Sequence, residues 1–110
     1  EPRGAPMNAP MNDYLLLMHE DAADAGIAND GARWGAYLAG LRASGGFDGG
    51  SSIGPGAVFR QSGKPAPLSV ALGGYLRVRA ASVEDAQRFL AGNPVYEAGG
   101  SVEIRELPRD

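Results

Sequence analysis

The chain contains one histidine, His19, and histidine is the side chain that titrates near neutrality when nothing perturbs it. Glu20 and Asp21 follow it directly, and Asp48 lies in a later glycine-rich segment. A carboxylate that orients an imidazole helps it to act as a general base, so His19 with Asp48 or Glu20 is a candidate catalytic pair. The competing interpretation is a solvated histidine at the end of a strand.

Arginines and a glutamate form a second candidate group. Arg77 and Arg79 alternate with apolar residues in YLRVRA, and Arg105 alternates with Glu103 in SVEIREL. If these segments are neighbouring strands, the side chains share one face of the sheet. A surplus of guanidinium groups over carboxylates suits a carboxylate or phosphate, so the sequence predicts a small anionic ligand. A salt-bridge network between two subunits is the alternative.

Three aromatic residues, Trp34, Tyr75 and Tyr96, are candidates for stacking on a planar ligand. Aromatic residues at such spacings more often pack in a core or an interface. The predicted ligand-binding set therefore combines aromatic and charged residues: Trp34, Tyr75, Arg77, Arg79, Glu103 and Arg105.

Composition argues against several kinds of site. One histidine and no cysteine leave carboxylates as the remaining metal ligands, and Asp21, Asp24 and Asp30 lack the spacing of a calcium loop. The glycines of DGGSSIGPG lack the lysine and Ser/Thr that a phosphate loop needs. We therefore expect no metal and no cofactor.

Charge and hydropathy narrow the range of partners. The formal net charge of −3 provides no basic footprint for nucleic acid. No apolar run approaches the roughly 20 residues of a membrane span, so we expect no membrane partner. The first residues lack the apolar stretch of a signal peptide, and we expect a cytoplasmic protein.

The apolar pattern predicts the elements that position these residues. The run YLLLMH, residues 14–19, is typical of a strand buried on both faces. The acidic, small-residue stretch after it predicts a loop. A stripe at helical spacing predicts a helix over residues 30–44; its members are Trp34, Tyr37, Leu38 and Leu41.

The second half continues with strand-like segments and one more helix. Residues 47–63 carry glycines and a proline within strand material, which predicts two short strands joined by a turn, or one strand bent at a bulge. A strand over residues 74–80 follows. Ser82 and Asp85 then predict the start of a helix with Ala86, Phe89 and Leu90 on its buried stripe, and a last strand covers residues 101–107.

The order strand, helix, strand, strand, helix, strand predicts an α+β fold, the ferredoxin-like β-α-β-β-α-β plait. Such a fold has an antiparallel sheet with two helices on one face, and its other face is bare. A bare, partly apolar face commonly meets a second subunit, so we expect a homodimer. We interpret residues 1–13 as a flexible leader and residues 14–110 as one domain.

An ordered set of segments resembles a known family. YLLLMH, LGGYLRV, SVEDAQRF and GGSVEIREL together resemble the YCII-related, or DGPF-domain, proteins over about residues 14–107. The resemblance implies a dimeric α+β barrel of ferredoxin-like subunits. It also implies relatives that act on small aromatic or lactone substrates, and DGPF members encoded beside sigma factors.

The chain departs from that family at residues that bear on catalysis. KPAPLSVAL, residues 64–72, replaces the DGPF signature, and Trp34 stands where the family has a histidine in the first helix. The segment NPVY, residues 93–96, replaces Asp-Pro-Tyr. A histidine–aspartate site therefore does not transfer to this chain.

Three functional hypotheses follow. The favoured one is a dimeric module that binds a small anionic or aromatic ligand, or a protein partner. The second is a small enzyme that acts on an anionic or aromatic metabolite with His19 as acid or base. The third, a regulatory partner of a sigma factor, rests on the resemblance alone.

Overall fold

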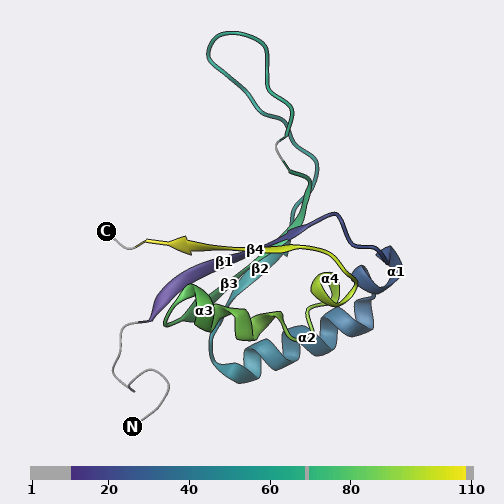
Figure 1. Cartoon of the computed structure of the whole chain (residues 1–110), viewed down its shortest axis with the longest axis vertical. Coiled ribbons are helices and arrows are strands. Elements are labelled where there is room, and N and C mark those ends of the chain that lie inside the picture. The colour runs from purple at the N-terminus through teal and green to yellow at the C-terminus, as the bar shows by residue number, and fades with distance from the viewer. Residues whose placement is uncertain (1–10, 69, 109–110) are drawn as a thin grey trace.

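The computed structural model describes residues 11–68 and 70–108, and Figure 1 shows how its elements are arranged. Its strands are β1 (Asn12–His19), β2 (Phe47–Ser52), β3 (Leu72–Ala80) and β4 (Val102–Leu107). Its helical segments are α1 (Ala25–Ala28), α2 (Gly31–Ser44), α3 (Val83–Ala86), the 3-10 helix η1 (Gln87–Leu90) and α4 (Pro94–Glu97).

The strands form one antiparallel sheet in the order β2-β3-β1-β4. Central strand β1 pairs on both sides: Leu16 lies opposite Leu76 of β3 and opposite Ile104 of β4. The helical segments lie together on one side of this sheet (Figure 1). The predicted α+β plait is therefore confirmed.

The core lies between the sheet and the helices. On β1, Tyr14, Leu16 and Met18 are buried, whereas Leu15 and Leu17 between them are only partly buried. The prediction that this strand is buried on both faces is therefore wrong for the single chain. Side chains alternate between the faces of a strand, and helices cover only one face of this sheet.

Helix α2 begins and ends where its sequence predicts. The carboxylate of Asp30 accepts hydrogen bonds from the backbone N–H groups of Ala32 and Arg33, which satisfies the free donors of the first turn. Gly45 ends the helix in the left-handed conformation with φ of 80°. Before it, the predicted loop contains the short helix α1, whose first turn is capped by Asp24.

The second predicted helix is interrupted. Ser82 caps α3 by accepting a hydrogen bond from the Asp85 N–H at 3.0 Å, as predicted. After one turn the chain tightens into η1, turns at Gly92 with φ of 83°, and starts α4 at Pro94. Asn93 caps α4 through its Oδ1, and Pro94 stands at the first helical position, where its missing N–H costs no hydrogen bond.

Strand β2 is short and bulged. Its pairing with β3 shifts between Phe47 and Gly50, and Gly49 has a φ of 98° there, so the bent strand was the better of the two predictions. From Ile53 onward the chain leaves the sheet. The segment up to β3 projects away from the rest of the molecule as a long loop (Figure 1), with the Phe59 side chain 84% exposed.

Strand β1 starts at Asn12, two residues before the predicted domain. The remainder of the predicted leader that precedes residue 11 lies outside the described residues. Within the part of the chain that the structure describes, no helix has the length and apolar character needed to cross a bilayer.

Candidate functional site

A cavity of about 600 Å³ lies on the helix side of the sheet. Helices α1 and α2 border it on one side, and the paired ends of β2 and β3 border it on the other. His19, Glu20 and Ala22, at and after the end of β1, also line it, together with Val95 of α4. The cavity is therefore built by segments from both halves of the chain.

Glycines keep the sheet side of the cavity open. Gly49 and Gly50 of β2 and Gly73 and Gly74 of β3 line it, and none of them projects a side chain into the space. A Cβ atom on Gly50 would collide with the backbone carbonyl oxygen of Tyr75. These glycines therefore allow the strands to approach one another and leave room above them for a ligand.

One face of α2 forms the opposite wall. Trp34, Leu38 and Arg42 line the cavity at positions i, i+4 and i+8, which lie above one another on a helix. The indole Nε1 of Trp34 donates a hydrogen bond of 2.7 Å to the Ala28 carbonyl, and its ring meets Tyr37 edge-on with centroids 5.7 Å apart. Trp34 is therefore held in one orientation.

The four residues of the predicted helical stripe divide into two groups in the structure. Tyr37 and Leu41 are buried beneath α2, whereas Trp34 and Leu38 are only partly buried and line the cavity. Burial raises the pKa of Tyr37, whose hydroxyl donates a hydrogen bond of 2.6 Å to the Phe89 carbonyl. The buried group anchors α2, and the other group faces the open space.

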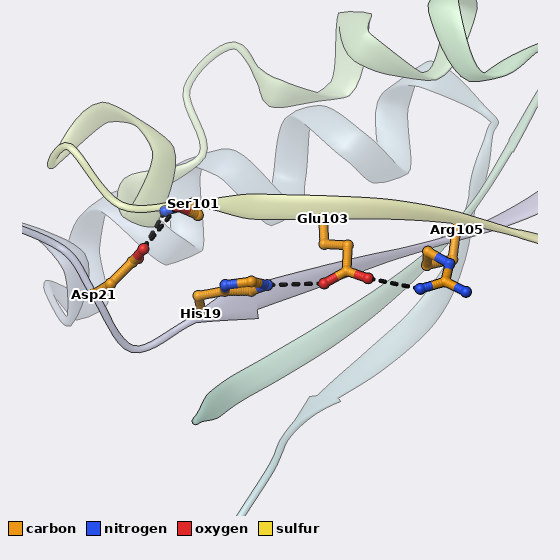
Figure 2. Close-up of polar contacts among 5 residues, drawn as sticks. All are labelled: His19, Asp21, Ser101, Glu103 and Arg105. Carbon is orange, nitrogen blue, oxygen red and sulfur yellow. Dashed lines mark hydrogen bonds and ion pairs between the residues drawn. The ribbon is translucent and has the colours of Figure 1, made fainter. Parts of the chain in front are cut away.

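His19 is paired with a carboxylate, but not with either predicted partner. Its Nε2 lies 3.0 Å from Oε1 of Glu103, and Arg105 Nη1 donates to Oε2 of the same carboxylate at 2.9 Å (Figure 2). The hydrogen bond from Arg105, followed by that with His19, holds the pKa of Glu103 below its usual value. His19, Glu103 and Arg105 thus form a row across β1 and β4.

The other predicted carboxylates have different roles. Asp21 accepts hydrogen bonds from the hydroxyl and the backbone N–H of Ser101, at 2.7 and 2.8 Å (Figure 2), and these bonds lower its pKa. Asp48 pairs with Arg79, whose Nε lies 2.8 Å from its Oδ2. Asp48 does not line the cavity, whereas Glu20 does and its side chain lies beside Gly73.

The predicted arginines lie on the open face of the sheet rather than in the cavity. The register places Arg77 and Arg105 on either side of Leu15, and Tyr75 and Glu103 on either side of Leu17. Tyr75 borders the cavity from β3, although strand alternation turns its side chain to the open face with Leu17. The structure thus separates the predicted set into a cavity group and an open-face group.

Sequence reasoning missed Arg42 and the four glycines. Arg42 continues the spacing of Trp34 and Leu38 by one more helical turn, and that spacing was the available signal. The glycines of residues 47–63 predict a turn or a bulge, and Gly73 and Gly74 carry no site prediction. Pairing between segments distant in sequence decides which atoms face a cavity, so the sequence alone does not show this lining.

Comparisons with known proteins bear on the fold. No protein-family model matches the chain, and no curated protein is similar to it in sequence. A solved structure of 5-chloro-2-hydroxyhydroquinone dehydrochlorinase from Burkholderia phenoliruptrix AC1100, in complex with 2,5-dihydroxybenzoquinone, is similar with a TM-score of 0.54. The two chains are 15% identical, over 89% of this chain and 95% of that one. At this identity the similarity shows a shared α+β fold and nothing further.

Proposed function

We propose that the chain binds a small planar ligand in the cavity between α2 and the sheet. The observation that carries this proposal is the combination of a glycine floor with an oriented Trp34 on the opposite wall. A cavity of about 600 Å³ falls within the range of small-molecule sites, roughly 300–1,000 Å³. A flat ring would fit between an aromatic wall and a floor that lacks side chains.

The similar solved structure supports the ligand class. That dehydrochlorinase holds 2,5-dihydroxybenzoquinone, a small planar ring with polar substituents. In this chain the cavity places aromatic and apolar groups beside polar ones such as Asn29 and Ser52. Both features suit a ring that carries oxygen substituents at its edge.

The proposal extends to the family of the chain and to its oligomeric state. We assign the chain to the YCII-like group of the dimeric α+β barrel proteins, on the segments that resemble that family. The open face of the sheet, with Leu15 and Leu17 at its centre, would join two copies of the chain.

The fluorescence of Trp34 provides a direct test, since it is the sole tryptophan of the chain. Titration with 2,5-dihydroxybenzoquinone and related dihydroxylated rings should change the fluorescence intensity until the binding site is saturated. Calorimetry of the same titration provides a check that is free of optical artefacts. At about 100 times its dissociation constant a bound ligand should stabilise the fold by about 2.7 kcal/mol.

Two variants test whether the ligand binds in the cavity or on the open face of the sheet. Trp34→Ala removes the aromatic wall and should weaken binding about 2- to 10-fold by calorimetry. Arg77→Gln, on the open face, should bind as the parent does. If no planar ring binds the parent, or if Arg77→Gln loses binding and Trp34→Ala keeps it, the cavity is not the site.

Acid–base catalysis at His19 is the second candidate function. It is favoured by the contact between His19 and Glu103, because a carboxylate that accepts from one imidazole nitrogen leaves the other free to take a proton. Arg105 in turn holds Glu103. His19 lines the cavity and contacts Glu103 on the open face, so it would move protons to and from a hydroxylated ring bound at that edge of the cavity.

Deuterium exchange tests this candidate. A ring ligand that binds should exchange its ring protons in D₂O faster with the parent than in buffer, as followed by NMR. His19→Gln should abolish the acceleration and keep the affinity. Unchanged exchange in that variant would leave binding as the function of the cavity.

A further inference from the structure

Arg42 is the arginine of α2 that reaches the cavity. Its guanidinium carbon lies 6.0 Å from the centre of the Phe47 ring, and both residues line the space. A guanidinium above an aromatic face remains able to donate hydrogen bonds from its edge. Arg42 therefore presents donors next to apolar surface.

Four other arginines in the described part of the chain are paired with carboxylates. The pairs are Arg33 with Asp30, Arg79 with Asp48, Arg88 with Asp85, and Arg105 with Glu103. Arg42 makes no such ion pair with any residue that the structure describes. A cation that lines a cavity and lacks a carboxylate is suited to an anionic ligand.

The acidic group of the cavity lies far from Arg42. Glu20 lies beside Gly73 of β3, whereas Phe47, which Arg42 covers, is paired with Val78. Gly73 and Val78 are five residues apart on one strand, a distance of roughly 17 Å. The two ends of the cavity therefore differ in charge, and Arg42 is not neutralised by Glu20.

We propose that the preferred ligand is an aromatic carboxylate, with its carboxylate on Arg42 and its ring along Leu38 and Trp34. One guanidinium matches one carboxylate through two parallel hydrogen bonds. A phosphate would need more positive charge than this cavity offers, since Arg42 is the one arginine or lysine among the described residues that line it and Glu20 lines it too. The inference rests on the proposed function and adds the charge of the ligand and the residue that selects it.

Matched ligand pairs test the inference on the full chain. Benzoate and benzamide have the same shape and differ in charge, as do 1-naphthoate and 1-naphthamide. The parent should bind each carboxylate about 10-fold or more tightly than its amide, as a hydrogen-bonded charge pair implies. Because Arg42 is exposed, raising NaCl from about 50 to 500 mM should reduce this preference.

Variants at Arg42 should change selectivity while leaving amide binding intact. Arg42→Gln should bring the ratio of carboxylate to amide affinity close to one. Arg42→Lys should keep a smaller preference, because an ammonium lacks the planar fork. Arg77→Gln is the matched control: it removes an arginine that also lacks an ion pair among the described residues, but from the open face.

The outcomes separate this inference from the proposed function. Equal affinity for carboxylate and amide in the parent, or a preference that survives in Arg42→Gln, overturns the role of Arg42 and leaves ring binding in place. A preference lost in Arg77→Gln places the anion on the open face, as the sequence predicted. If neither member of any pair binds the parent, the proposed function fails with it.

Discussion

Phe89 and Tyr37 hold η1 against α2 through two kinds of contact. The Phe89 ring is 4% exposed, and its tip approaches Gly46 so closely that a Cβ there would lie 3.1 Å from Cζ. The backbone carbonyl of Phe89 accepts the buried hydrogen bond from the Tyr37 hydroxyl. One residue thus fills the core and joins two elements.

Phe89→Ala should lower the free energy of unfolding by about 3–5 kcal/mol, because it removes a buried ring and leaves a cavity. Chemical denaturation followed by circular dichroism measures the loss. The burial predicted from the sequence is confirmed. A loss below about 1 kcal/mol would show that the ring contributes little to the core in solution.

Glu103 should make stability depend on pH in the acid range. Its folded-state pKa is depressed from the usual 4.5, first by the hydrogen bond from Arg105 and then by that with His19. A depressed pKa contributes stability that is present above the unfolded-state value and is lost as pH falls through the folded-state value. The parent should therefore lose stability as the pH drops below about 4.5.

Glu103→Gln should flatten that part of the curve of unfolding free energy against pH, and Glu106→Gln on the same strand should leave it unchanged. Thermal unfolding between about pH 2.5 and 7 covers the window in which the carboxylate titrates. Parallel curves for the parent and Glu103→Gln would mean that the row of His19, Glu103 and Arg105 does not persist in solution.

At the scale of elements, the pairing of β2 with β3 depends on two glycines of β2. Its bulge at Gly49 and the close approach of Gly50 to Tyr75 bring the strand against β3. The same glycines line the cavity. The pairing of this edge strand and the shape of the site therefore depend on the same positions.

Gly50→Ala should destabilise the fold by about 1–3 kcal/mol, as overpacking does, since the new Cβ meets backbone that cannot rotate away. Gly54→Ala is the control, because a Cβ there meets nothing within 4 Å. Denaturation of both variants measures the difference. Equal stabilities would mean that β2 moves freely relative to β3.

At the scale of the whole molecule, the sheet has one covered and one open face. Leu15 and Leu17 lie at the centre of the open face, each between side chains of β3 and β4. Arginines and carboxylates surround them, among them Arg77, Arg105 and Glu103. An apolar centre with a charged rim is the usual composition of a subunit interface.

We expect the parent to be a dimer at micromolar concentration, with at least about 1,000 Å² buried in total. Leu17→Glu should give a folded monomer by light scattering, because it places a charge at the centre of that interface. Ala39→Glu, on the exposed side of α2, should remain dimeric. A monomeric parent, or dimers disrupted by Ala39→Glu alone, would argue against the open face.

The sequence by itself determined the order of the strands and of the two helical regions between them, and which side chains share a face in β3 and β4. Alternation in YLRVRA and SVEIREL was sufficient because side chains of a strand alternate regardless of its neighbours. Asp30 and Gly45 marked the ends of α2, since caps act through local hydrogen bonds and local backbone conformation. These signals are contained within a few consecutive residues.

Only the tertiary structure decided what each candidate residue contacts. His19 pairs with Glu103, 84 positions away, rather than with its sequence neighbour Glu20. Arg42 and Gly50 line the same cavity because β2 follows α2 in the chain, folds back and pairs with β3. Such contacts depend on the register of strands and on packing between distant segments, and no short stretch of sequence encodes either one.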